Sequence, residues 1–203
     1  MEKKKSFSII SFLSAILAVI FLAGCGTSSP SDSDRGNKGT NGAVKEGQEA
    51  ETPIKDSKTF TSTDGIIELT TPDNWEEIED LNSAANIQIG DLSLEQYTIT
   101  ITESTADFAD SFGLRNYYDA IIPPMQQNIT NAEVSDIKEI KVGGNDAIQF
   151  HLSGEVSSIK VTYLITVIQS EDYFHQIISW TLQSMYSEYE DLYKSIADSL
   201  TEK

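Results

Sequence analysis

Cysteine is nearly absent from this chain, because Cys25 is the only one among 203 residues. An intramolecular disulfide therefore cannot form, and packing and hydrogen bonds alone must hold the fold. Histidine is almost as scarce, with His151 and His175 as the only two. A zinc site or a histidine-dependent catalytic site would need these two side chains to lie close together.

Basic residues are also few: 14 Lys and Arg stand against 32 Asp and Glu, which gives a formal net charge of −18 at pH 7. A surface of this sign repels phosphate groups, so DNA and RNA are not expected partners. Strong acidity is a common means of keeping an exported domain in solution, and it identifies no partner by itself.

Only one long hydrophobic run is present, between Phe7 and Ala23, and it directly follows three lysines at positions 3–5. This arrangement is typical of a bacterial signal peptide. An uncleaved membrane helix is the alternative, because about 17 residues approach the minimum needed to span a bilayer. The small residues that close the run favour cleavage, and we interpret residues 1–24 as a signal peptide.

The run ends in Leu22-Ala23-Gly24-Cys25, which resembles a bacterial lipobox. In that motif, cleavage before the cysteine leaves the thiol to carry a diacylglyceryl anchor. Two acyl chains on one residue, such as palmitate, suffice for stable attachment to a membrane. The resemblance implies a lipoprotein held through Cys25 at the extracytoplasmic, outer face of the cell membrane.

Residues 25–58 contain no aromatic residue and are rich in Ser, Gly, Thr and Asn. Such a segment cannot bury enough apolar area to offset the entropy of ordering it. We interpret it as a flexible linker that spans roughly 30 Å on average between the lipidated cysteine and a folded domain. The remaining residues, 59–203, suffice for one domain with its own core.

The first half of this domain shows strand patterns and one helix. Strands are predicted at 59–63, 66–70, 87–89 and 96–102, with a turn at Asp64-Gly65. Apolar residues from Leu114 to Met125 recur at helical spacing. Because proline lacks an N–H and restricts the residue before it, Pro123-Pro124 predicts a kink or an early end of this helix.

The second half predicts four strands and a closing helix. The strands lie at 132–142, 146–153, 160–169 and 173–182, and their short connections indicate an antiparallel meander. An apolar stripe from Met185 to Leu200 then indicates the helix. Ser187 and Glu190 stand in capping-box relation, and Ser184 is an earlier possible start.

The strand at 160–169 decides the expected architecture. One face carries Val161, Tyr163, Ile165 and Val167, and the other carries Leu164 and Ile168. A strand that is apolar on both faces is covered on both faces. Because two amphipathic helices are available, we expect an α+β fold in which helices cover both faces of an antiparallel sheet.

The order of elements resembles the PsbP-like (Mog/PsbP-like) fold, an α/β/α sandwich, over residues 59–200. The resemblance is carried by the Asp64-Gly65 turn, by Pro72-Asp73-Asn74-Trp75, by the Gly143-Gly144 turn and by the final Ser199-Leu200. The family often has glycine where this chain has Asn74. Its members include extrinsic photosystem subunits, a Ran-binding import factor and many bacterial lipoproteins without assigned activity. The resemblance implies a non-enzymatic binding or accessory module, because fold alone does not define a reaction.

No catalytic residue, metal ligand or cofactor site is predicted. The strand connections place His175 opposite Ile168 and His151 near Thr162, roughly 20 Å apart at about 3.3 Å per residue. We therefore interpret the two histidines as separate surface or edge residues. The acidic run Glu76-Glu77-Ile78-Glu79-Asp80 lacks the ligand spacing and the glycine of a calcium loop, which favours a solvated turn.

The aromatic residues leave one question open. Trp75 and Trp180 are expected to anchor the core. Five tyrosines on the two predicted helices exceed what packing needs, so they form either the edge of the core or an exposed partner site, and we favour the core edge. They are Tyr117, Tyr118, Tyr186, Tyr189 and Tyr193.

Three functions are compatible with these patterns. The first is a lipid-anchored accessory module that binds an envelope protein or a small ligand. The second is an envelope hydrolase with a site built from scattered residues, which would require a deep pocket lined by convergent polar groups. The third is a purely structural protein of the envelope.

Overall fold

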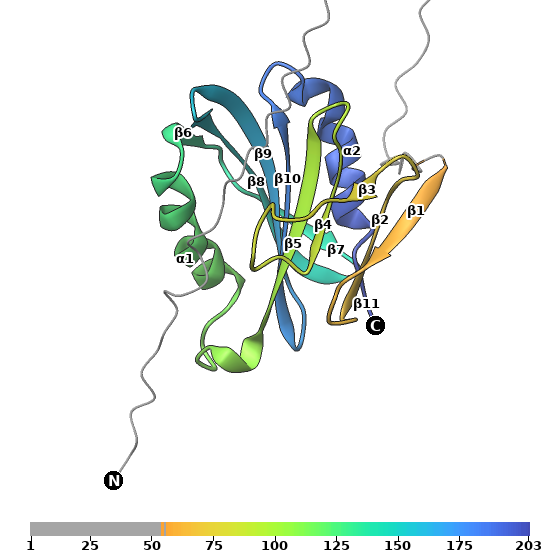
Figure 1. The fold of residues 1–203 in the computed structure, drawn as a ribbon. Coiled ribbons are helices and arrows are strands. Elements are labelled where there is room, and N and C mark those ends of the chain that lie inside the picture. The colour runs from red at the N-terminus through yellow and green to blue at the C-terminus, as the bar shows by residue number, and fades with distance from the viewer. Residues whose placement is uncertain (1–53, 55) are drawn as a thin grey trace, which may run out of the picture.

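The computed structural model describes residue 54 and residues 56–203. They form an eight-stranded sheet, a three-stranded sheet and two α-helices, and every strand pair is antiparallel (Figure 1). The signal peptide, the lipobox, Cys25 and most of the predicted linker lie outside the described residues. Among the residues that are described, no helix combines the length and the apolar character needed to cross a membrane.

The strands of the first half are β1 (Ser57–Thr61), β2 (Ile67–Pro72), β3 (Glu76–Glu77), β4 (Ile87–Asp91) and β5 (Gln96–Ser104). The strands of the second half are β6 (Thr130–Val134), β7 (Lys138–Val142), β8 (Asn145–Val156), β9 (Ile159–Gln169), β10 (Tyr173–Leu182) and β11 (Thr201–Glu202). The helices are the short 3-10 helix η1 (Thr105–Asp107), α1 (Leu114–Gln127) and α2 (Tyr186–Asp198).

The large sheet has the strand order β3-β4-β5-β10-β9-β8-β6, and β7 also pairs with β8. The consecutive neighbours β8, β9 and β10 confirm the predicted meander. The pairing of β5 with β10 joins the two halves of the domain. The small sheet has the order β1-β2-β11, so the last strand of the chain pairs with an early one.

The two faces of the large sheet belong to different hydrophobic clusters. On β9, Val161, Tyr163, Ile165 and Val167 pack in one cluster with the buried residues of α1. Leu164 and Ile168 pack in the other cluster with α2 and with Ile67 and Leu69 of β2. The small sheet therefore supplies part of the cover on the α2 side (Figure 1). Cover by helices alone is not confirmed.

Two expectations in the middle of the chain were wrong: an early end of the helix at its prolines and a single strand over residues 132–142. Helix α1 does not end early at its prolines but continues to Gln127. Because proline has no N–H, the carbonyl groups of Asp119 and Ala120 lack their usual donors within the helix. Both residues are exposed, so water can supply the missing hydrogen bonds. The expected strand at 132–142 is two strands, β6 and β7, separated by three residues, and both pair with β8.

Of the two starts offered for the closing helix, Ser187 was wrong, whereas Ser184 directly precedes the cap residue Met185. Helix α2 begins at Tyr186 after Met185, whose side chain makes no capping hydrogen bond, so Ser187 lies inside the helix. Tyr186 is buried and contacts the rings of His151 and Tyr193. This tertiary packing extends the helix towards its N-terminus and overrides the local capping signal. The short strands β3 and β11 were not predicted.

Candidate ligand pocket

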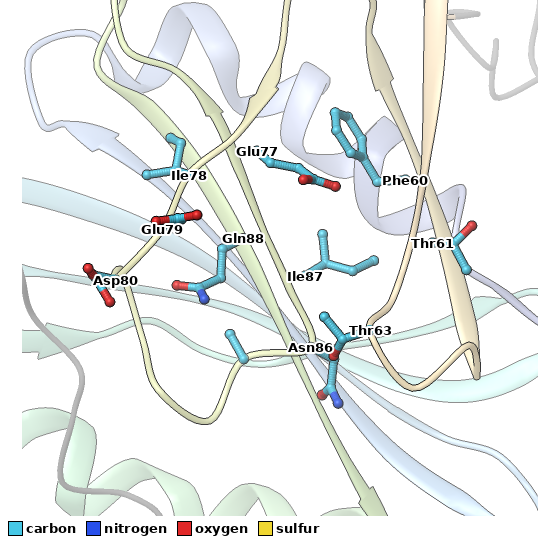
Figure 2. Close-up of a pocket in the computed structure, with 11 residues that line it drawn as sticks. Phe60, Thr61, Thr63, Glu77, Ile78, Glu79, Asp80, Asn86, Ile87 and Gln88 are labelled. Carbon is cyan, nitrogen blue, oxygen red and sulfur yellow. The ribbon is translucent and has the colours of Figure 1, made fainter.

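A pocket of about 330 Å³ lies where β1, β3 and β4 meet (Figure 2). Its lining comes from β1 and the residues after it, from β3 and the residues after it, and from the start of β4. The lining residues are Phe60, Thr61, Thr63, Glu77, Ile78, Glu79, Asp80, Ala85, Asn86, Ile87 and Gln88. They belong to three segments far enough apart in sequence that no single motif defines the site.

Backbone hydrogen bonds hold the walls of the pocket around β4. The N–H of Thr63 donates to the carbonyl oxygen of Asn86 at 3.1 Å, and the N–H of Ile78 donates to that of Gln88 at 2.9 Å. Phe60 and Ile87 are buried and belong to the same core cluster as Trp75. The pocket therefore has a rigid apolar base that is continuous with the core, and Trp75 is confirmed as a core anchor.

The two amides of the lining are fixed by partners outside it. Gln88 Oε1 accepts a hydrogen bond from the N–H of Asn82 at 2.7 Å. Asn86 Nδ2 donates to Asp64 Oδ2 at 2.6 Å, and Asn86 Oδ1 accepts from the N–H of Thr102 at 2.7 Å. Side chains held in this way need little further ordering when a ligand binds.

Three carboxylates stand at the pocket: Glu77, Glu79 and Asp80. All three residues are exposed, and within residues 56–203 none of their carboxylates has a hydrogen bond or ion pair. The Glu77 side chain extends towards Phe60 (Figure 2). No three acidic, histidine or cysteine side chains of the described chain are grouped closely enough to hold a metal ion. The predicted solvated turn is thus partly strand β3 and partly a pocket wall.

A cation already lies against one wall residue. The ammonium nitrogen of Lys58 lies 4.6 Å from the centre of the Phe60 ring. The same Nζ donates to the carbonyl oxygen of Trp75 at 3.4 Å. Aromatic faces attract cations through their quadrupole, and the chain's own Lys58 uses the Phe60 ring in this way.

The two histidines lie on the same face of the large sheet, on strands β8 and β10 with β9 between them, and do not form a common site. His175 lies opposite Ile168, as predicted, whereas His151 lies opposite Leu164 and not near Thr162. The difference arises because the β8–β9 turn is the two-residue pair Ser157-Ser158, both with positive φ, as in tight hairpins. Their partners on β9 are four residues apart, or about 13 Å.

His175 is fully buried, so the prediction of a surface or edge residue was wrong for it. Its Nε2 lies 2.8 Å from Glu202 Oε1, and its Nδ1 lies 3.0 Å from Thr102 Oγ1. Because a carboxylate can only accept, Nε2 carries the proton and the Thr102 hydroxyl donates to Nδ1. Burial lowers the pKa of His175, since the cost of desolvating the charged form exceeds the attraction of Glu202.

The tyrosines form the edge of the core, as favoured from the sequence. Tyr117, Tyr186 and Tyr193 are buried. The Tyr117 hydroxyl donates to Glu103 and accepts from Gln176 Nε2. Burial, reinforced by the Glu103 charge, raises the pKa of Tyr117. Trp180 is half-buried and stacks on Tyr97 with ring centres 5.3 Å apart.

Comparison with known proteins identifies the fold. No protein-family model matches the chain, and no curated protein sequence matches it. Among solved structures, it resembles cyanobacterial PsbP (CyanoP) from Synechocystis sp. PCC 6803, with a TM-score of 0.56, 13% identity, and coverage of 77% of this chain and 98% of that one. The fold is PsbP-like.

A second similar structure is that of a protein involved in cell envelope biogenesis. LpqN of Mycobacterium tuberculosis, described as involved in cell envelope biogenesis, matches with a TM-score of 0.53 and 18% identity, over 72% of this chain and 90% of that one. At these identities the likeness concerns the fold alone. Function must therefore be argued from this chain's own side chains.

The pocket presents both polar and apolar groups to a ligand. Its described lining offers carboxylates, two amides, two threonine hydroxyls and apolar side chains, but no histidine, cysteine or lysine. The Thr61 hydroxyl donates to Glu68 Oε1 at 3.0 Å, and the Thr63 hydroxyl has no side-chain partner within the described residues. On this PsbP-like scaffold the pocket can hold a ligand by charge, hydrogen bonds and apolar contact.

Proposed function

We propose that this protein is a lipoprotein anchored through Cys25 at the outer face of the cell membrane, whose PsbP-like domain acts as a non-enzymatic binding or accessory module. The lipobox Leu22-Ala23-Gly24-Cys25 supports the anchor. The PsbP-like fold, together with the similarity to a protein involved in cell envelope biogenesis, supports the accessory role. The pocket between β1, β3 and β4 is the proposed ligand site.

The pocket carries this proposal because it combines a rigid base with unused polar groups. Phe60 and Ile87 are buried in the core, while the carboxylates of Glu77 and Glu79 have no partner among the described residues. Binding sites typically place a few polar groups over an apolar base in this way. Elsewhere in residues 56–203, the exposed large hydrophobic side chains are Leu92 and Leu94, on the β4–β5 turn.

Anchoring is tested by metabolic labelling with radioactive palmitate. The wild-type chain should incorporate the label and fractionate with membranes. Cys25→Ala should lose essentially all of the label, because the thiol is the attachment atom. A labelled Cys25→Ala protein would contradict the anchor, and Ser28→Ala serves as a matched control that should remain labelled.

Binding is tested by photo-crosslinking of the full chain in intact envelopes. A small diazirine amino acid replaces Thr63, which lines the pocket, is exposed and makes no side-chain hydrogen bond within the described part of the chain. The control position is Glu139, an exposed residue of β7. This strand pairs with β8, towards the edge of the large sheet opposite to β3 and β4. A discrete adduct at position 63 that is absent at position 139 supports the proposal. Equal background at both positions would reject the pocket as a ligand site.

An envelope hydrolase is the second candidate, because Thr102, His175 and Glu202 form a continuous hydroxyl–imidazole–carboxylate chain. The imidazole is fully buried, and none of the three residues lines the pocket. A hydroxyl-directed phosphonate probe distinguishes the candidates. Labelling of Thr102 that disappears in His175→Gln would favour the hydrolase, and the binding module predicts no labelling.

A further inference from the structure

We propose that the pocket takes an organic cation, namely an ammonium or guanidinium group carried on a short aliphatic chain. This inference rests on the proposed function of the pocket as a ligand site and names the chemistry of the ligand. It follows from the charge of the wall, the apolar base, the size of the pocket and the Lys58–Phe60 contact.

The wall of the pocket carries negative charges that form no ion pair among residues 56–203. Glu77, Glu79 and Asp80 contribute three carboxylates, and the lining includes no basic side chain. None of these carboxylates is engaged by a cation within residues 56–203. Clefts lined by one sign of charge raise the local concentration of the opposite charge. An anionic or purely apolar ligand would leave this charge without a counterpart.

The distribution of the carboxylates favours an organic cation over a metal ion. A divalent cation requires several oxygens within about 2.3–2.6 Å, as in calcium sites. The described residues contain no such grouping. The pocket of about 330 Å³ instead has room for a ligand of several heavy atoms. A cation with several N–H donors can reach carboxylates that are too far apart to share one metal ion.

The base of the pocket suits the aliphatic part of such a ligand. Phe60 and Ile87 are buried apolar side chains, and Ile78 adds a partly buried one. Lys58 already demonstrates the combination, since its ammonium group lies over the Phe60 ring. A ligand ammonium can use the same ring or displace Lys58 from it. Long cationic side chains bury their methylene groups in this manner while the charged end stays near polar atoms.

Two sources can present this chemistry: a free diamine, or a lysine or arginine side chain of another envelope protein. Cadaverine represents the first source. Nα-acetyl-lysine methylamide and Nα-acetyl-arginine methylamide represent the second. The neutral control 1,5-pentanediol has the same five-carbon chain as cadaverine but carries no charge.

The inference is tested by isothermal titration of the full chain, solubilised in detergent, with these four probes. At least one cationic probe should bind with an affinity tenfold or more above that of the diol. Raising the salt concentration from about 20 to 200 mM should weaken cation binding several-fold, because exposed charges are screened. Tighter binding of cadaverine indicates a free diamine, and tighter binding of a capped amino acid indicates a side chain.

Matched variants locate the binding. Glu77→Gln combined with Glu79→Gln should weaken cation binding about tenfold, since two charge contacts are lost without a change of shape. Glu139→Gln removes an exposed carboxylate outside the pocket and should leave binding unchanged. Phe60→Leu keeps the base apolar and should weaken ammonium binding a few-fold through loss of the ring. Circular dichroism of each variant confirms that the fold is retained.

Failure of the inference can be separated from failure of the proposed function. Two outcomes would overturn the cation assignment. The first is equal affinity for the diol and the cations. The second is that no cation binds at concentrations up to about 10 mM, roughly the weakest affinity of interest. Calcium that binds more tightly than every organic probe would overturn it as well. If the crosslink at position 63 persists in any of these cases, the pocket remains a ligand site for a different chemistry.

Discussion

At the scale of single residues, His175 shows how a scarce side chain can be structural and still depend on pH. It is fully buried, with Thr102 and Glu202 on its two ring nitrogens. Asp64 contributes a further, more distant negative charge. The sequence did not predict this network because Glu202 reaches the imidazole only after β11 pairs with β2, and a two-residue strand has no detectable pattern.

Stability should fall on acidification as a result. The pKa of His175 is lower in the folded chain than its ordinary value of about 6.5. The unfolded chain therefore binds more protons near pH 6, so this contribution is complete above about pH 6.5 and is lost as the pH falls through the folded pKa. Urea unfolding at pH 7.5 and 5.5 should show the loss, and His175→Gln should reduce it.

His175→Gln also tests the network itself. At pH 7.5 we expect the free energy of unfolding to fall by about 1–3 kcal/mol, because buried partners lose well-formed hydrogen bonds. His151→Gln is the matched control. His151 is only half-buried and its pKa is also lowered by burial, so this variant should alter the pH dependence with a smaller loss at pH 7.5. Equal effects of the two variants at pH 7.5 would contradict the assigned role of His175.

At the scale of elements, long strands that are apolar on both faces were predictable and short strands were not. β10 was predicted with its observed bounds, and β9 was predicted to within one residue at its start. Both owe their pattern to two buried faces. Strand β3 has two exposed glutamates and forms only because β4 offers a free edge. The pocket could not be predicted for the same reason, since it requires β1 and β3 to meet at β4.

Helix α2 offers a matched pair of tyrosines. The buried Tyr186 hydroxyl has no hydrogen-bond partner, whereas the Tyr193 hydroxyl donates to the carbonyl oxygen of Trp180 at 3.0 Å. Tyr186→Phe should leave stability unchanged or raise it by up to about 1 kcal/mol, because an unsatisfied polar group is removed. Tyr193→Phe should lower it by about 1 kcal/mol, because a hydrogen bond is lost. Urea unfolding of both variants gives the comparison, and a reversed order would refute it.

At the scale of the whole molecule, β9 joins the two hydrophobic clusters. Leu164 belongs to the cluster on the α2 side and its neighbour Ile165 to the cluster on the α1 side. The chain has no disulfide that could hold one cluster together after the other opens. The PsbP-like fold was recognisable from the sequence because the order of elements is a whole-molecule property. The contribution of β11 and the small sheet was not, because their contacts are long-range.

The shared strand predicts that both clusters unfold together. Trp75 lies in the α2-side cluster, and Trp180 packs against the α1-side cluster, so each tryptophan reports on one face. Trp180→Phe leaves Trp75 as the only reporter, and Trp75→Phe leaves Trp180. Fluorescence should give the same urea midpoint as circular dichroism within each variant, as expected for two-state unfolding of a single domain. Adding Leu164→Ala to either variant should lower the urea midpoints reported by both tryptophans to the same extent. The free energy of unfolding should fall by about 2–5 kcal/mol, as for other buried leucines. Because Leu164 belongs to the α2-side cluster, a shift confined to the Trp75 signal would show that the two faces unfold independently.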